Sequence, residues 1–377
     1  MTRHELRPPV RKALADAPAG GHNRWHPDLP PALAVDAGDE IAVDCRDGLD
    51  GQITPATSDA DLSALDLRRG HPLTGPIAVR GAVPGDVLKV EILAIDTDGF
   101  GSTAVFPGFG LLGDLFLEPY LATWGLHGGF ATSGRLDGVR IPADPFVGVI
   151  GVAPSHERLE RFRAREAAIA EAGGIALPPE AGAAVPAREP YASTALRTIP
   201  PRETGGNLDV PQARAGATVF LPVDVPGALL SLGDVHFAQG DGEVCGTAIE
   251  THARVTIRVD VLPAARLGFR PQTPAFESVE PDWKGGRRHF VTTGLPIRPD
   301  GSNADMDTTL AARNAVLAMI EWLAAERGLS REAAYVLCSV AVDLRVSEIV
   351  DVPNPVVSAL CPLDIFHSIA PRRGSAR

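Results

Sequence analysis

Short stretches of alternating or continuous apolar residues, separated by turn residues, dominate the chain from about position 35 onward. Within 87–95, Leu88, Val90 and Ile92 alternate with the residues of the opposite face, which is the period of a half-buried strand. Positions 253–262 repeat this alternation. Further strands are predicted over 40–47, 76–80, 147–152, 217–225 and 228–232.

Helical periodicity is less common. The clearest helix is predicted over 308–327, with Asp307 in the N-cap position and Gly328 after the last turn. A charged, periodic stretch predicts another helix over 156–172. A third is expected to begin after Ser330 and to lead into an alternating strand.

These elements predict a mostly β (α+β) fold: a β-rich sandwich or barrel-like core with a few helices and an α/β C-terminal part. The 377 residues suffice for one large domain or two ordinary ones, and no strict repeat divides them. We therefore treat 1–377 as one unit. An internal division, if present, is expected in the stretch rich in proline and alanine near 175–200.

Charge and cysteine usage restrict the partners. The net charge is −12, with acidic and basic residues mixed along the chain, so neither nucleic acid nor an anionic membrane is an expected partner. The N-terminus is polar and no apolar run approaches the roughly 18 residues of a membrane span. Four isolated cysteines, with no C-x-x-C pair, suggest a reducing compartment, and we expect a cytoplasmic protein.

The segment 233–243, GDVHFAQGDGE, is the strongest candidate for chemistry. Asp234 and His236 are two positions apart, so on a strand both side chains face the same way. Glu243 follows a Gly-Asp-Gly turn at Asp241. One histidine and several carboxylates over a short span suit a divalent metal such as zinc. A simple hairpin with solvated acids explains the same pattern, and the residues alone leave the two interpretations even.

A second candidate lies at the end of the strand predicted over 40–47, where Asp44 and Asp47 are followed by Gln52. The two aspartates cannot share one face of a regular strand, so at most one would point at a metal. A polar turn leaving the core is the simpler interpretation of these residues taken alone.

A third candidate is the Gly205-Gly206 pair followed by Asn207 and Asp209. The glycines permit close backbone approach and would supply N–H groups to an oxyanion, although an ordinary turn before a strand fits equally. No G-x-S-x-G elbow, phosphate loop or G-x-G-x-x-G opening a helix is present.

Several segments together resemble the acetamidase/formamidase family along nearly the whole chain. They are HNRWHPDLPP (22–31), DCRDGLDGQI (44–53), PLTGPIAVRGAVPGD (72–86), IPADPFVGVIGVAPS (141–155), GGNLDV (205–210), GATVFLPVDVPGALLSLGDVHFAQGDGE (216–243) and DVPNP (351–355). Their number and order make the match specific. The HNRWHPD opening and the length of the chain resemble the formamidase branch more than the shorter acetamidases.

The resemblance implies a β-rich homo-oligomer that hydrolyses formamide or another short amide, with a bound divalent metal, zinc first and calcium second. Carried over onto this sequence, it implies Asp47, Asp209 and His236 as metal ligands, Glu243, Glu250 and Asn207 as catalytic groups, and Asp44, Gln52, Gly206 and Asp241 as substrate-binding groups. His71 stands where many relatives have asparagine, so no role is assigned to it.

The expected mechanism uses the metal to polarise the amide and to activate a water. Glu243 or Glu250 would move the proton, and Asn207 would hold the oxyanion. Aromatic residues near Trp25 and at 106–109 would keep the pocket small. Two alternatives remain open: an acetamidase or lactamase with a wider pocket, and a non-catalytic relative that binds small amides.

Overall fold

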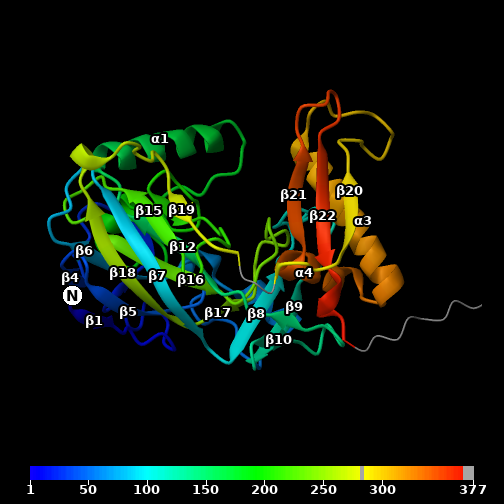
Figure 1. Cartoon of the computed structure of the whole chain (residues 1–377), viewed down its shortest axis with the longest axis horizontal. Coiled ribbons are helices and arrows are strands. Elements are labelled where there is room, and N and C mark those ends of the chain that lie inside the picture. Colours follow the sequence, from blue (N-terminus) through cyan, green and yellow to red (C-terminus); the bar gives the residue numbers. More distant parts are fainter. Residues whose placement is uncertain (281–283, 368–377) are drawn as a thin grey trace, which may run out of the picture.

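The computed structural model describes residues 1–280 and 284–367. Figure 1 shows two lobes: a larger one that carries the N-terminus and most strands, and a smaller one built from the C-terminal strands and two helices. Two extended sheets form the larger lobe, and the second of them continues toward the smaller lobe.

The first sheet has six strands and lies on the outside of the larger lobe. Its order is β1 (Arg3–Leu6), β5 (Glu40–Cys45), β18 (Ala253–Leu262), β7 (Val87–Thr97), β15 (Thr218–Pro222) and β19 (Ala275–Glu277). Among the strand pairs that the structure describes in this sheet, β1–β5 alone is parallel. The alternation read in the sequence is therefore that of antiparallel strands with one face on a core.

The second sheet has eleven strands, and we call it the long sheet. Its main path is β11 (Ile141–Pro142), β10 (Phe130–Thr132), β9 (Tyr120–His127), β8 (Phe100–Val105), β17 (Glu250–Thr251), β16 (Leu230–His236), β12 (Phe146–Val152) and β14 (Gly205–Asn207). From β16 it branches through β6 (Leu73–Val79) to β2 (Gly21–His22) and β4 (Leu33–Val35). Strand β16 thus lies at a junction inside the sheet.

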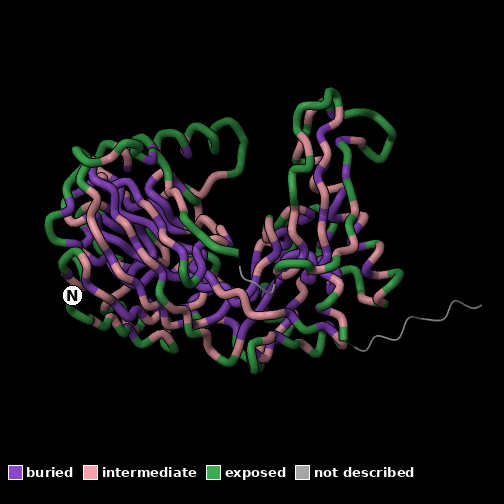
Figure 2. Tube along the Cα trace, in the orientation of Figure 1, coloured by how far each residue is buried: buried purple, intermediate pink, exposed green. Residues whose placement is uncertain are grey.

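One hydrophobic core fills the space between the two sheets. It contains Leu88, Val90 and Ile92 of β7 and Leu230 and Leu232 of β16, all with at most 1% of their surface exposed. Figure 2 shows buried segments concentrated in this interior. Each such side chain contributes about 1.5–3 kcal/mol by leaving water, which makes this core a rigid support for residues on β16.

The smaller lobe packs helices against both a short sheet and the far end of the long sheet. Its elements are α3 (Thr308–Arg327), α4 (Arg331–Ala341), β20 (His289–Gly294), β22 (Val356–Pro362) and β21 (Asp343–Glu348), with β22 central. Among the described residues, the remaining helices are α1 (His156–Glu171) and α2 (Tyr191–Thr194), and the strands β3 (Arg24–Trp25) and β13 (Leu196–Arg197) pair with each other. Short 3₁₀ turns lie at Asp59–Ala64, Leu67–Arg69, Ala264–Arg266 and Leu363–Ile365.

The predicted fold class is confirmed: strands outnumber helices, and the helices are few. The described sheets form a sandwich and no closed barrel. The strand predicted over 228–232 instead begins at Leu230, because Ala228 and Leu229 have φ of 58° and 56° and cannot pair in a ladder. It extends further, to His236. Within the described residues, no helix has the length and apolar character needed to cross a membrane.

Candidate active site

The site is built where β16 and β17 pair at the centre of the long sheet. His236 and Glu250 lie directly opposite each other in this antiparallel pair, so both side chains project from the same face. His236 Nε2 is 3.4 Å from Glu250 Oε2 and 3.5 Å from Asp234 Oδ2. Asp209, just after β14, brings its Oδ1 to 3.9 Å from the same nitrogen. Three carboxylates therefore converge on one imidazole.

Two glycines leave room for these carboxylates. A Cβ on Gly48 would lie 2.1 Å from Asp234 Oδ1 and 3.3 Å from Glu250 Oε2. A Cβ on Gly148 would lie 2.8 Å from Asp209 Oδ1. Neither glycine has a positive φ, so the requirement is for space and not for backbone freedom.

Three of the acidic residues have a left-handed backbone. The φ angles of Asp209, Asp234 and Glu243 are 49°, 53° and 43°. This region costs an L-residue on the order of 1 kcal/mol, and such conformations persist where the surrounding structure imposes them. Left-handed residues of this kind concentrate at functional sites.

The tautomer of His236 is set by Gln239. The Gln239 Nε2 donates to the carbonyl of Asp209 at 3.0 Å, so its Oε1 accepts from His236 Nδ1 at 2.8 Å. In the neutral ring, Nε2 then presents its lone pair to the carboxylates. A lone pair facing carboxylate oxygens is repulsive unless a proton or a cation lies between them.

Several acceptors of the cluster lack donors. Among the described residues, Asp209 Oδ1, Asp234 Oδ1 and Glu250 Oε2 are buried without a hydrogen-bond partner. Buried carboxylate oxygens are normally paired or coordinate a metal, because leaving them unpaired is costly. One imidazole nitrogen with carboxylate oxygens matches the ligands of zinc, and the oxygens alone would also suit calcium.

His71 adds a second imidazole next to Asp234, with Nδ1 3.0 Å from the same Oδ2 that faces His236. Burial on its own lowers the pKa of His71, but the negative charges of Asp234 and its neighbours outweigh this effect, and the resulting pKa is about 9. Burial on its own raises the pKa of Asp234, but the positive charges of His71 and His236 outweigh this effect and hold the pKa well below its usual range. This carboxylate is therefore ionised at neutral pH.

The other carboxyl groups are shifted the opposite way. Burial raises the pKa of Glu250 to about 7, against the opposing effect of His236. Burial, together with the charge of Asp209, raises the pKa of Glu243 well above its usual range. Burial also raises the pKa of Asp209, to about 6. A carboxyl poised near neutrality is suited to general acid–base work, and such clusters mark candidate active sites.

The cluster opens into a cavity of about 350 Å³. Its polar lining includes His71, Asn207, Asp209, Asp234, Glu243, Thr247, Glu250, Arg68 and Arg197. Its large apolar lining residues are Leu49, Leu67, Phe106, Phe109, Leu177 and Ile199. Most lining residues lie in loops, whereas Asp234, His236 and Glu250 lie on strands of the long sheet. A rigid base and loop-built walls are typical of enzyme sites.

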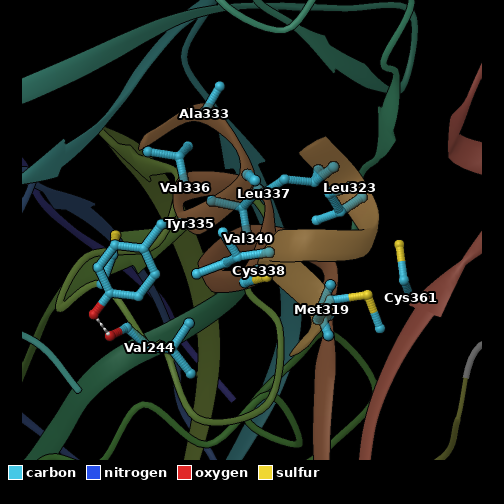
Figure 3. Close-up of a cluster of buried hydrophobic side chains, with 14 of the residues drawn as sticks. Val244, Met319, Leu323, Ala333, Tyr335, Val336, Leu337, Cys338, Val340 and Cys361 are labelled. Carbon is cyan, nitrogen blue, oxygen red and sulfur yellow. Dashed lines mark hydrogen bonds between the residues drawn. The ribbon is translucent and has the colours of Figure 1, made fainter. Parts of the chain in front are cut away.

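Helix α4 holds the loop that carries Glu243. The Tyr335 hydroxyl donates to the carbonyl of Val244, as Figure 3 shows, and Ser339 Oγ donates to the carbonyl of Thr247 at 2.7 Å. The connection from β16 to β17 is therefore a long loop packed under the helix and not the tight hairpin that the Asp-Gly pair could indicate.

The structure brings together half of the residues assigned from the sequence. Asn207, Asp209, His236, Glu243 and Glu250 lie at the same site. Gly206 precedes Asn207 but pairs with Ile150 in the sheet and does not line the cavity.

Four others have partners elsewhere. Asp44 forms an ion pair with Arg254 at 2.6 Å on the first sheet. The Asp47 carboxylate accepts N–H groups of its own loop and faces His252 at 3.3 Å. Strand β5 ends before it, and so its side chain turns back to close that loop.

Gln52 spans the same loop by bonding both the N–H and the carbonyl of Asp66, and Asp241 lies against Asp343. Trp25, expected near the pocket, is instead buried with Leu73 and Phe162. Its side chain packs in the core because β3 pairs with β13.

Sequence reasoning gave no role to His71, Gln239 or the two glycines. Asp234 was also given no role, although its spacing of two positions from His236 on a strand indicated that the two side chains face the same way.

Comparison with known proteins places the chain in a family. The model of the Acetamidase/Formamidase family matches residues 9–368. The chain belongs to this family. It is 36% identical to an acetamidase from Mycolicibacterium smegmatis over 359 residues, 86% of each chain. It is 35% identical to a formamidase from Methylophilus methylotrophus over 364 residues, covering 92% of this chain and 89% of that one.

Among solved structures, a γ-lactamase from Delftia acidovorans matches with a TM-score of 0.90 at 33% identity, covering 96% of this chain and 93% of that one. Membership of the acetamidase/formamidase family makes this chain an amide hydrolase by descent. The buried acid–histidine cluster is the part of it suited to that chemistry.

Proposed function

We propose that this chain hydrolyses a carboxamide to the carboxylic acid and ammonia, with short linear amides such as formamide among its substrates, and that a divalent metal, zinc first, binds at Asp209, Asp234 and His236. The convergence of unpartnered, buried carboxylate oxygens on His236 Nε2 is the observation that carries the proposal. Candidate ligand atoms of the three residues lie within 4.8 Å of one another, as one ion requires.

The residues fit the ion in charge as well as in distance. Asp234, Glu250 and His236 are buried, and Asp209, Glu243 and His71 beside them are partly buried. Carboxylate oxygens without donors belong to Asp209, Asp234 and Glu250. When bound, a divalent ion would polarise the amide carbonyl and lower the pKa of an attacking water. His236 would keep its Nε2 lone pair available because its Nδ1–H donates a hydrogen bond to Gln239 Oε1, which keeps the proton on Nδ1.

Proton movement falls to Glu250. Its Oε1 is fixed by the N–H of Ala248 at 2.9 Å, which leaves Oε2 free beside His236. Burial raises the pKa of Glu250 to about 7 in the metal-free protein, and such a carboxyl is suited to take a proton from the attacking water and to deliver it to the amide nitrogen as the C–N bond breaks. Burial, together with the charge of Asp209, raises the pKa of Glu243 well above its usual range, which favours the protonated form, a hydrogen-bond donor.

Asn207 lines the same cavity, and its Oδ1 position is buried without a partner. The side-chain amide of Asn207, in either orientation, is placed to bond the substrate: through N–H to the carbonyl oxygen or through C=O to the amide nitrogen. In the first orientation it would stabilise the developing oxyanion.

Replacing His236 with alanine tests the proposal. Purified protein is assayed for bound metal, for ammonia released from formamide and acetamide, and for the amino acid formed when a γ-lactam ring is opened, because that reaction releases no ammonia. We expect His236→Ala to lose both bound metal and ammonia release, whereas His127→Ala, at an exposed position, should keep both. Full activity of His236→Ala would overturn the metal role. Binding of amides without ammonia release by the metal-loaded wild type would favour the non-catalytic alternative.

A further inference from the structure

The cavity is much larger than the smallest amides require. Formamide has three heavy atoms and occupies roughly twice the volume of a water molecule, about 60 Å³. The cavity measures about 350 Å³. Even with an ion and a water beside His236, most of this volume would remain empty around formamide. Water left in an apolar space forms poor hydrogen bonds, so filling it with substrate is favourable.

The walls beyond the acid cluster are mainly apolar. Leu49 and Phe106 are each 8% exposed and form fixed parts of the wall. Leu177 and Ile199 come from the segment near 175–200 and are partly exposed, whereas Phe109 is 51% exposed and lies at the opening. These side chains offer an acyl group dispersion contacts and removal from water but no specific hydrogen bond.

Two arginines also line the cavity, and their main contacts are with the protein. Arg68 binds Asp66 through two nitrogens, at 2.7 and 2.9 Å. Arg197 donates to the carbonyl of Leu67 at 3.2 Å, and its Nε is buried without a hydrogen-bond partner in the part of the chain that the structure describes. At Arg68, a carboxylate-bearing substrate would have to compete with Asp66. Arg197 has no such competitor among the described residues, so a charged substrate must be included in the test.

We propose that the preferred substrates of this site are amides with an uncharged, apolar acyl group of four or more carbons, open-chain or cyclic. The amide group lies at His236 and Glu250, and the acyl group fills the apolar half of the cavity. This inference rests on the proposed function, because it assigns the acyl specificity of the same reaction.

The test is ammonia release by metal-loaded protein from formamide, acetamide, butyramide, hexanamide and benzamide. Each methylene that becomes buried should raise kcat/KM by about fourfold, so butyramide should exceed acetamide by roughly 15-fold. A kcat/KM highest for formamide, or flat along the series, would overturn the inference and leave the amide hydrolase intact. If no amide in the series is hydrolysed, the proposed function itself fails.

Succinamate provides the charged comparison, since it matches the length of a short acyl chain but ends in a carboxylate. We expect its kcat/KM to be at least tenfold below that of butyramide. A higher value for succinamate would overturn the apolar assignment and give the arginines the decisive role.

Narrowing the cavity gives a second readout. In Leu177→Trp, the ratio of kcat/KM for hexanamide to that for acetamide should fall at least tenfold, and Ile199→Phe should lower it in the same direction. Leu117→Trp is the matched control, because Leu117 is 65% exposed and does not line the cavity. Thermal midpoints establish that each variant is folded. An unchanged ratio in both folded cavity variants would overturn the inference.

Discussion

Replacing Gly48 with alanine would place a methyl group where the Asp234 carboxylate lies. The added Cβ would be 2.1 Å from Asp234 Oδ1, whereas ordinary contact begins at 3.4 Å. The carboxylate must then move by about 1.3 Å. It has no free direction, because His71 is 3.0 Å away and His236 is 3.5 Å away.

A misplacement of about 1 Å at a reacting centre costs on the order of 100-fold in rate, or about 2.7 kcal/mol of transition-state stabilisation. We therefore expect kcat/KM of Gly48→Ala to fall at least 100-fold, with loss of bound metal and little change in the thermal midpoint. Steady-state ammonia release and metal content of the purified protein measure the two effects.

Gly134→Ala is the matched control. A Cβ at Gly134 would meet nothing within 4 Å, and its φ is not positive, so this variant should behave as wild type. Wild-type kcat/KM in a folded Gly48→Ala protein would refute the reasoning, because it would mean that the position of the Asp234 carboxylate does not matter for the reaction.

Two further predictions concern stability. Tyr335→Phe removes the hydroxyl that donates to the carbonyl of Val244 and accepts from the N–H of Leu112. The free energy of unfolding measured in urea should therefore fall by about 2 kcal/mol. An unchanged value would mean that these two hydrogen bonds do not stabilise the fold. Burial lowers the pKa of His22 to about 4, so as the pH falls below about 6.5 the unfolded chain binds a proton at this residue before the folded protein does. The free energy of unfolding in urea should therefore be lower at pH 5 than at pH 8 by about 2 kcal/mol on account of His22. His22→Asn should reduce this difference between the two pH values, whereas His127→Asn, at an exposed position, should leave it unchanged.

The parts of the fold that sequence predicts well are those whose signals are local. Helix α3 runs from Thr308 to Arg327 as expected, because Asp307 accepts the N–H of Leu310 and Gly328 adopts φ of 69°. Strand β18 matches its prediction for a similar reason: its alternation reflects burial on one face only. Caps and periodicity act within a few residues and can be read without the rest of the chain.

The site depends on pairings that sequence does not reveal. His71 reaches Asp234 because β6 pairs with β16, with Leu73 opposite Gly233, and no spacing in the sequence indicates that register. Asp47 had the type and place of a metal ligand, but its carboxylate closes its own loop. Local chemistry identified the residue types, whereas the sheet register decided which of them meet.

The left-handed acids give a way to compare other members of the family. Each of Asp209, Asp234 and Glu243 costs the fold on the order of 1 kcal/mol in backbone conformation, a noticeable fraction of a typical folding free energy of about 5–15 kcal/mol. Glycine or asparagine would relieve that cost at each position. A relative that kept the fold but no longer catalysed hydrolysis would have no selection to retain these acids. Acids retained at all three positions would therefore distinguish relatives still under selection for catalysis from those that only keep the architecture.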